Sequence, residues 1–329
     1  MIISRTPFRI SFAGGGSDIK EYYLEYGGSV LSTSIDKYIY LSMHKYFNEN
    51  KFFLKYSKNE LVDNVDKIDH KIIKCVLKDY RIKGIDFNSS ADIPSGTGLA
   101  SSSAFTVGLS TLCNAYTNKY LSKENVAKYA CDVEIKKLNE PIGKQDQYAC
   151  AIGGLNFIEF NQDDSVSIEK IILTSEKTNM LDNNLLMFYL GSTRLASDIL
   201  IEQKENILTN KTKVMSLHKI VKLSQELKSE LSQGNIDAMG DILHRGWMYK
   251  KELASKISND DINYYYNLAI RHGAMGGKLL GAGGNGFLLF YVPSDKQQDV
   301  RNVLKDLQET KFSFEQEGSK ILYYNDSER

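Results

Sequence analysis

The alternation of hydrophobic and polar residues divides the first half of the chain into strands and helices. β-Branched and aromatic residues such as Val30, Ile35 and Tyr38 favour extended structure. We predict strands over residues 8–13, 29–47, 84–90, 155–160 and 166–173. Helical spacing predicts helices over about 70–80, 102–118, 122–138 and 143–151. The polar segment 52–69 fits neither pattern.

The second half shows strands separated by helices. A strand is predicted over 185–190, followed by helical character over about 196–257 and 260–272, strands over 276–282 and 286–292, a helix over 295–309 and a strand over 320–324. This order, with its closing strand–helix–strand pattern, predicts an α+β domain. The polar stretch 174–184 is the best boundary, so we expect domains over 1–180 and 181–329.

Composition restricts the class of partner. The 329 residues hold 41 Lys and Arg against 41 Asp and Glu, so no global field attracts nucleic acid or an anionic membrane. The four cysteines and five histidines are scattered, which argues against a zinc site. No signal peptide or membrane-spanning stretch stands out, and we expect a cytoplasmic protein, monomeric or homodimeric, that acts on small molecules.

One segment carries the clearest chemical signal. Residues 92–104 combine a proline, two glycines and three consecutive serines at the start of a predicted helix. A glycine-rich loop that enters a helix gathers backbone N–H groups at the positive end of the helix dipole, which suits phosphate. No Gly-Lys-Ser/Thr follows, so this is not a P-loop. A tight turn with a serine cap is the less favoured alternative.

Two further glycine-rich segments accompany this loop. Gly14, Gly15, Gly16, Ser17 and Asp18 follow a strand, and a carboxylate there suits sugar hydroxyls. A flexible turn with Asp18 capping a helix explains the same residues equally well. The run from Lys278 to Phe287 lies between two strands, and taken alone it favours a hairpin loop.

Together, the three segments resemble those of the galactokinase, homoserine kinase, mevalonate kinase and phosphomevalonate kinase (GHMP) superfamily. The matching motifs are Pro7-Phe8-Arg9, the run from Pro94 to Ser102, and the run from Gly281 to Gly286. The Gly-Gly-Gly-Ser-Asp run and Gly143 to Gln147 look most like the D-glycero-D-manno-heptose 7-phosphate kinases, and bacterial fucokinase domains share much of the pattern. The resemblance implies a two-domain α+β fold, with a ribosomal protein S5 domain 2-like N-terminal domain and a ferredoxin-like C-terminal domain.

The resemblance also implies a role for particular residues. ATP phosphates would lie on the phosphate loop, with Mg²⁺ held by Ser102 and Glu134. Asp146 matches the family's catalytic aspartate, and Arg9 matches the basic residue beside it. The loop consists of Pro94, Gly96, Thr97, Gly98, Leu99, Ala100, Ser101, Ser102 and Ser103, and the C-terminal glycine loop contains Gly281, Ala282, Gly283 and Gly284.

The sequence identifies the sugar substrate less directly than the ATP-binding residues. The chain has Gly15 and Gly16 where galactokinases carry Glu and His, which argues against galactose. A phosphorylated sugar needs a basic clamp, and Arg194 and Lys37 are candidates. We therefore expect ATP and heptose 7-phosphate as substrates. A kinase of an unphosphorylated sugar such as fucose is the alternative, and a non-catalytic sugar sensor is a more distant one.

Overall fold

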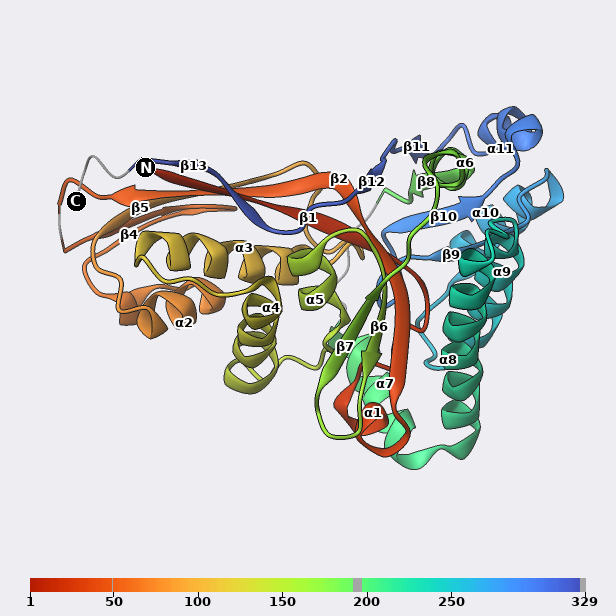
Figure 1. Cartoon of the computed structure of the whole chain (residues 1–329), viewed down its shortest axis with the longest axis horizontal. Coiled ribbons are helices and arrows are strands. Elements are labelled where there is room, and N and C mark those ends of the chain that lie inside the picture. Colours follow the sequence, from red (N-terminus) through yellow and green to blue (C-terminus); the bar gives the residue numbers. More distant parts are fainter. Residues whose placement is uncertain (49, 192–196, 326–329) are drawn as a thin grey trace.

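The computed structural model describes residues 1–48, 50–191 and 197–325 and contains two β-sheets with their helices (Figure 1). In these residues the first sheet has nine strands, of which β1 (Ile2–Ala13) and β2 (Gly28–Lys45) are the longest and pair antiparallel. The others are β3 (Phe52–Lys55), β4 (Asn59–Val62), β5 (Ile85–Ala91), β6 (Leu155–Phe160), β7 (Val166–Lys170), β12 (Phe314–Glu315) and β13 (Lys320–Tyr324).

β2 organises this sheet because it is long enough to pair with several strands. Its first part pairs with β6 and its last part with β5, while β1 runs along its other edge. Helices cover one face of the sheet (Figure 1): α2 (Lys71–Asp79), α3 (Ser101–Tyr116), α4 (Lys123–Cys131) and α5 (Gln145–Ile152). α3 packs against β1 and β2 and is buried almost all round, as a helix with apolar or small residues on every side must be.

The second sheet has the order β11-β8-β10-β9 and is antiparallel. Its strands are β8 (Leu185–Tyr189), β9 (Gly276–Leu279), β10 (Phe287–Tyr291) and β11 (Gln308–Glu309). The accompanying helices are α7 (Ser197–Thr209), α8 (Lys211–Ser232), α9 (Ala238–Lys251), α10 (Asp260–Arg271) and α11 (Gln297–Val303). α8 also packs against β1 and β2, so the two halves of the chain share an interface.

Most predicted elements are confirmed, and three regions were missed. The segment 52–69, which fitted neither pattern, contains strands β3 and β4. Residues 174–184, predicted to be a polar linker, form helix α6 (Ser175–Asn183), whose first turn is capped by the Thr174 side chain. Only Leu181 of this helix is buried, so the sequence shows no apolar periodicity. The short helix α1 (Lys20–Tyr26) also lacked a pattern long enough to predict it.

The last predicted strand lies in the other sheet. Residues 320–324 were expected to close the second domain, but β13 pairs antiparallel with β1, and β12 pairs with β2. A division at residue 180 therefore separates the two sheets except for this returning segment, which lies beside β1 in Figure 1. The remaining short elements are the 3₁₀ turns Val65–Lys67 and Ser294–Lys296 and a π-helix, Asp132–Lys137.

Candidate active site

The glycine-serine loop leads directly into α3. Gly96, Gly98 and Ala100 adopt positive φ angles of 76°, 86° and 69°, which turn the backbone sharply before the helix begins at Ser101. No side chain of the described residues forms a capping hydrogen bond at this N-terminus. The first N–H groups of α3 thus point out of the helix without a side-chain acceptor, as an anion-binding helix end requires.

The C-terminal glycine loop contacts the phosphate loop through backbone atoms. A methyl group added to Gly98 would lie 2.6 Å from the carbonyl oxygen of Leu280, and one added to Gly281 would overlap the backbone of Gly98. Both glycines have positive φ. Side chains at either position would push the two loops apart, which explains why glycine is present in both.

Ser102 and Glu134 are brought together beneath the loop. The Ser102 hydroxyl donates to Glu134 Oε1 at 2.6 Å, and the Gln147 amide donates to Oε2 at 2.7 Å. Glu134 is fully buried, and this burial raises the pKa of its carboxyl despite the hydrogen bonds that oppose the shift. Glu134 lies in the π-helix Asp132–Lys137, an irregularity often found where a helix carries a functional side chain.

Arg9 connects the phosphate loop to Asp146. Its Nε donates to Asp146 Oδ1 at 2.9 Å, a second guanidinium nitrogen lies 2.7 Å from the same oxygen, and a third donates to the Gly98 carbonyl at 2.8 Å. Arg9 is buried, whereas the Asp146 side chain keeps a quarter of its surface exposed. Among the described residues, no donor is bound to Asp146 Oδ2, so this oxygen is available to a ligand.

The Gly14–Asp18 loop lies next to this pair. Asp18 accepts hydrogen bonds from the backbone N–H of Gly16 and Gln145 at 3.1 Å each, and from the Gln145 amide at 3.3 Å. Burial, together with the negative charge of nearby Asp146, raises the pKa of the Asp18 carboxyl to about 6. Two carboxylates with different environments therefore stand side by side at the junction of the loops.

Two lysines that our sequence reasoning did not assign also reach these loops. Lys278 of β9 donates to the carbonyl oxygens of Ser11 at 2.7 Å and Phe12 at 3.0 Å. Lys250 of α9 donates to the carbonyl oxygens of Leu279 at 3.3 Å and Gly281. Lys278 stands inside a motif that the sequence singled out, but nothing in the pattern distinguishes Lys250 from other helix lysines.

Comparison with known proteins identifies the family. The model for the GHMP kinases N terminal domain matches residues 67–154, and the model for the GHMP kinases C terminal region matches residues 227–311. A D-glycero-alpha-D-manno-heptose 7-phosphate kinase from Campylobacter jejuni is 31% identical over 97% of this chain and 98% of its own length. The chain is a GHMP kinase. It is therefore an ATP-dependent kinase that acts on an alcohol group.

Other relatives of this GHMP kinase are more distant. A galactokinase from Pyrococcus furiosus is 25% identical over 95% of each chain. A solved structure described as a D-glycero-D-manno-heptose 1-phosphate kinase from Bacteroides thetaiotaomicron superimposes with a TM-score of 0.82 at 24% identity, over 99% of this chain and all of that one. The structural likeness confirms the predicted two-domain GHMP fold. In the described residues, no helix of the kinase has the length and apolar character needed to cross a bilayer.

The assignment of two residues to a sugar-phosphate clamp stays a prediction. Arg194 lies outside the described residues. Lys37 lies 3.3 Å from the Asp36 carboxylate, and no hydrogen bond or ion pair in the described part of the kinase connects Lys37 with Arg9, Asp18 or Asp146. The structure instead places the amide of buried Gln203 against Gly16, where an added methyl group would overlap it. No motif or periodicity in the sequence marks Gln203 as a site residue.

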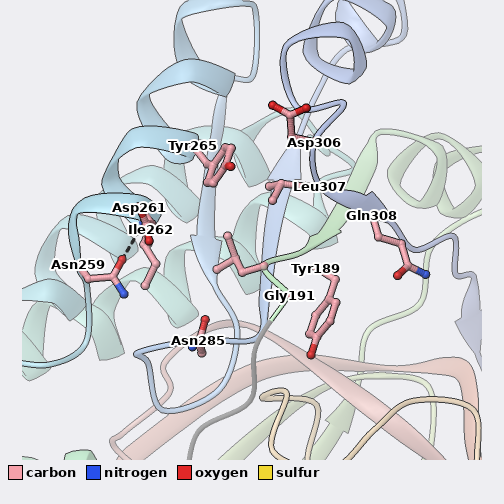
Figure 2. Close-up of a pocket in the computed structure, with 11 residues that line it drawn as sticks. Tyr189, Gly191, Asn259, Asp261, Ile262, Tyr265, Asn285, Asp306, Leu307 and Gln308 are labelled. Atoms are coloured by element: carbon pink, nitrogen blue, oxygen red, sulfur yellow. Dashed lines mark hydrogen bonds between the residues drawn. The ribbon is translucent and has the colours of Figure 1, made fainter.

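A separate cavity of about 520 Å³ lies at the end of β8 in the kinase (Figure 2). It is open and polar, with Tyr265, Asp306 and Leu307 on one side and Asn285 at its base. None of the predicted catalytic or phosphate-loop residues lines it. Asn285 belongs to the run from Gly281 to Gly286, so the cavity adjoins the C-terminal glycine loop.

Asp18→Asn tests the charge environment of that junction. Because the folded pKa of Asp18 is about 6, above the usual value near 4, the folded kinase binds more protons than the unfolded chain between these pH values. Ionised Asp18 therefore lowers the free energy of unfolding as the pH rises through this window. The melting temperature of Asp18→Asn, measured relative to wild type, is expected to be several degrees higher at about pH 7.5 than at about pH 5. If the melting temperatures of Asp18→Asn and wild type differ by the same amount at both pH values, the ionisation of Asp18 is not the cause of the difference.

Proposed function

We propose that this kinase transfers the γ-phosphoryl group of ATP to the anomeric hydroxyl of D-glycero-α-D-manno-heptose 7-phosphate. The product is the 1,7-bisphosphate, a precursor of nucleotide-activated heptose for surface polysaccharide. The observation that carries the chemistry is the position of Arg9, which binds Asp146 and the Gly98 carbonyl together. This contact brings a proton acceptor to the end of the phosphate loop. The relative that is 31% identical supports the sugar.

In the proposed reaction, Asp146 accepts the proton of the attacking sugar hydroxyl through its unoccupied Oδ2. The sugar oxygen forms a bond to the γ-phosphorus, and the bond between that phosphorus and the β–γ bridging oxygen breaks, leaving ADP. Arg9 keeps Oδ1 occupied and so orients the carboxylate. Its charge also stabilises the phosphoryl oxygens during transfer.

Ser102 and Glu134 fit the predicted Mg²⁺ site. Both supply the hard oxygen donors that Mg²⁺ prefers. In the described residues no Lys, Arg or His pairs with Glu134, although a fully buried carboxylate normally has a counter-ion. Bound there with ATP, the ion would neutralise phosphate charge. The N–H groups at the start of α3 would hold the phosphates themselves.

Ser102→Ala tests this metal site. Removing the hydroxyl takes away one oxygen donor and one hydrogen bond to Glu134. We expect the Mg²⁺ concentration for half-maximal activity to rise roughly tenfold, as for other weakened metal sites, with little change at saturating metal. Ser175→Ala, at an exposed position in the first turn of α6, is the control. An unchanged Mg²⁺ titration in Ser102→Ala would exclude the ligand role.

The Gly14–Asp18 loop supports a sugar other than galactose. Glycines at 15 and 16 leave the backbone bare, and the Gln203 amide occupies the space beside Gly16 that a larger side chain would need. Asp18 and Gln145 form a hydrogen-bonded pair suited to sugar hydroxyls. Arg194 and Lys37 stay proposed holders of the 7-phosphate.

The substrate is tested by incubating the purified kinase with ATP and heptose 7-phosphate, fucose or mannose 6-phosphate, and measuring ADP release. We expect the heptose phosphate to be turned over at least tenfold more efficiently in kcat/KM than either control. Turnover of fucose but not of the heptose would contradict the assignment and support an unphosphorylated sugar instead.

A further inference from the structure

The two lysines from the C-terminal half, Lys278 and Lys250, bind only backbone carbonyls. No carboxylate of the described residues lies within ion-pair distance of either ammonium group. Each lysine reaches a different loop of the active site. Lys278 contacts the strand that leads into the Gly14–Asp18 loop, and Lys250 contacts the C-terminal glycine loop.

Lys278 holds the end of β1. The register between β1 and β2 shifts between Ser11 and Ala13, which marks a bulge. A bulge leaves carbonyl groups without ladder partners, and Lys278 Nζ donates to Ser11 and Phe12 at this point. The chain continues from here into Gly14–Asp18. The lysine therefore fixes the origin of the loop assigned to the sugar.

Lys250 holds the C-terminal glycine loop. Its acceptors, Leu279 and Gly281, bracket Leu280, whose carbonyl oxygen faces Gly98. Gly281 and Gly98 are in backbone contact, so any shift of one loop is passed to the other. The lysine therefore fixes the surface against which the phosphate loop rests.

Buried lysines are costly, which argues that these contacts are needed. Lys278 is buried, and burial together with the charges of Lys250 and Arg9 lowers its pKa well below the usual range. Burial beside Arg9 lowers the pKa of Lys250 to about 7. A purely apolar packing role would be served better by Met or Leu.

We propose that Lys278 and Lys250 are positioning residues with separate targets, Lys278 for the sugar loop and Lys250 for the phosphate loop. The inference rests on the proposed assignment of Gly14–Asp18 to the sugar. Neither lysine is required to touch a substrate. Each acts through the backbone that it holds.

The proposal predicts opposite effects of two matched variants. Lys278→Met is expected to raise the KM for the sugar about tenfold and the KM for ATP less than twofold. Lys250→Met is expected to raise the KM for ATP about tenfold and the KM for the sugar less than twofold. Lys251→Met is the control, because Lys251 follows Lys250 on α9 and lies over the Trp247 ring instead. Lys278→Gln and Lys250→Gln, which keep a donor without the charge, are made in parallel and are expected to restore part of the loss.

Nucleotide binding is also measured without turnover, from the rise in melting temperature that ADP causes. This rise is expected to shrink in Lys250→Met and to stay at the wild-type value in Lys278→Met. The sugar KM is measured with whichever acceptor the wild type phosphorylates, so failure of the heptose assignment does not affect the test. Equal changes in both KM values in both variants, or lower melting temperatures with unchanged KM values, would overturn the proposal.

Discussion

Asp146→Asn is expected to lower kcat by roughly 10²–10⁴-fold, the usual contribution of a positioned proton acceptor. The amide keeps one oxygen for Arg9 but cannot accept the proton of the sugar hydroxyl. The KM for ATP should change little, because in the described residues no hydrogen bond or ion pair joins the Asp146 side chain directly to the phosphate loop. The measurement is steady-state kinetics with ADP release as the signal.

The control for this variant is Asp299→Asn, an exposed acidic residue in the first turn of α11. The melting temperature of Asp146→Asn should fall modestly, because buried Arg9 loses its charged partner. Activity above a tenth of the wild-type value would show that Asp146 is not the proton acceptor.

Glu134→Gln is expected to lower activity about 100-fold or more while leaving the melting temperature unchanged or higher. Activity should fall because the proposed Mg²⁺ site loses its charged ligand. The stability of the fold should not fall, because the variant removes a buried negative charge. The raised pKa of Glu134 shows that this charge disfavours the folded state. The new amide can be accommodated if the side chain of Gln147 turns over, since Gln147 Oε1 has no partner in the described residues.

Two measurements separate this metal role from a structural one. Mg²⁺ with ATP should raise the melting temperature of the wild type and of the control Glu124→Gln, which changes an exposed residue of α4. The same addition should have little effect on Glu134→Gln. A large loss of stability without nucleotide would instead assign Glu134 to the folding of the π-helix.

The sequence predicted the parts of the site that local chemistry requires. Gly96 and Gly98 adopt the positive φ angles that the turn before α3 needs, and the pattern from Pro94 to Ser103 predicted that a glycine-rich loop enters a helix here. The contact between Arg9 and Asp146 could be predicted only from the family resemblance, because 137 positions separate the two residues in the sequence. Their hydrogen bonds exist only after β1 and α5 have packed.

What the sequence missed depends on tertiary structure. The contact of Lys250 with the C-terminal glycine loop and the approach of Gln203 to Gly16 arise when the helices of the second half fold over β1 and β2. Lysine and glutamine are normally surface residues, so neither pattern nor composition marks them. The π-helix around Glu134 was predicted as a regular continuation of α4, since one extra residue in a turn leaves no signature in the periodicity.

The return of residues 314–324 to the first sheet affects how this protein is made. During synthesis, β1 and β2 leave the ribosome before the strand that covers the outer edge of β1, which is translated only after all four strands of the second sheet. That edge stays open to pairing with another chain until then. Completion of the first sheet therefore waits until residues 314–324 have been translated.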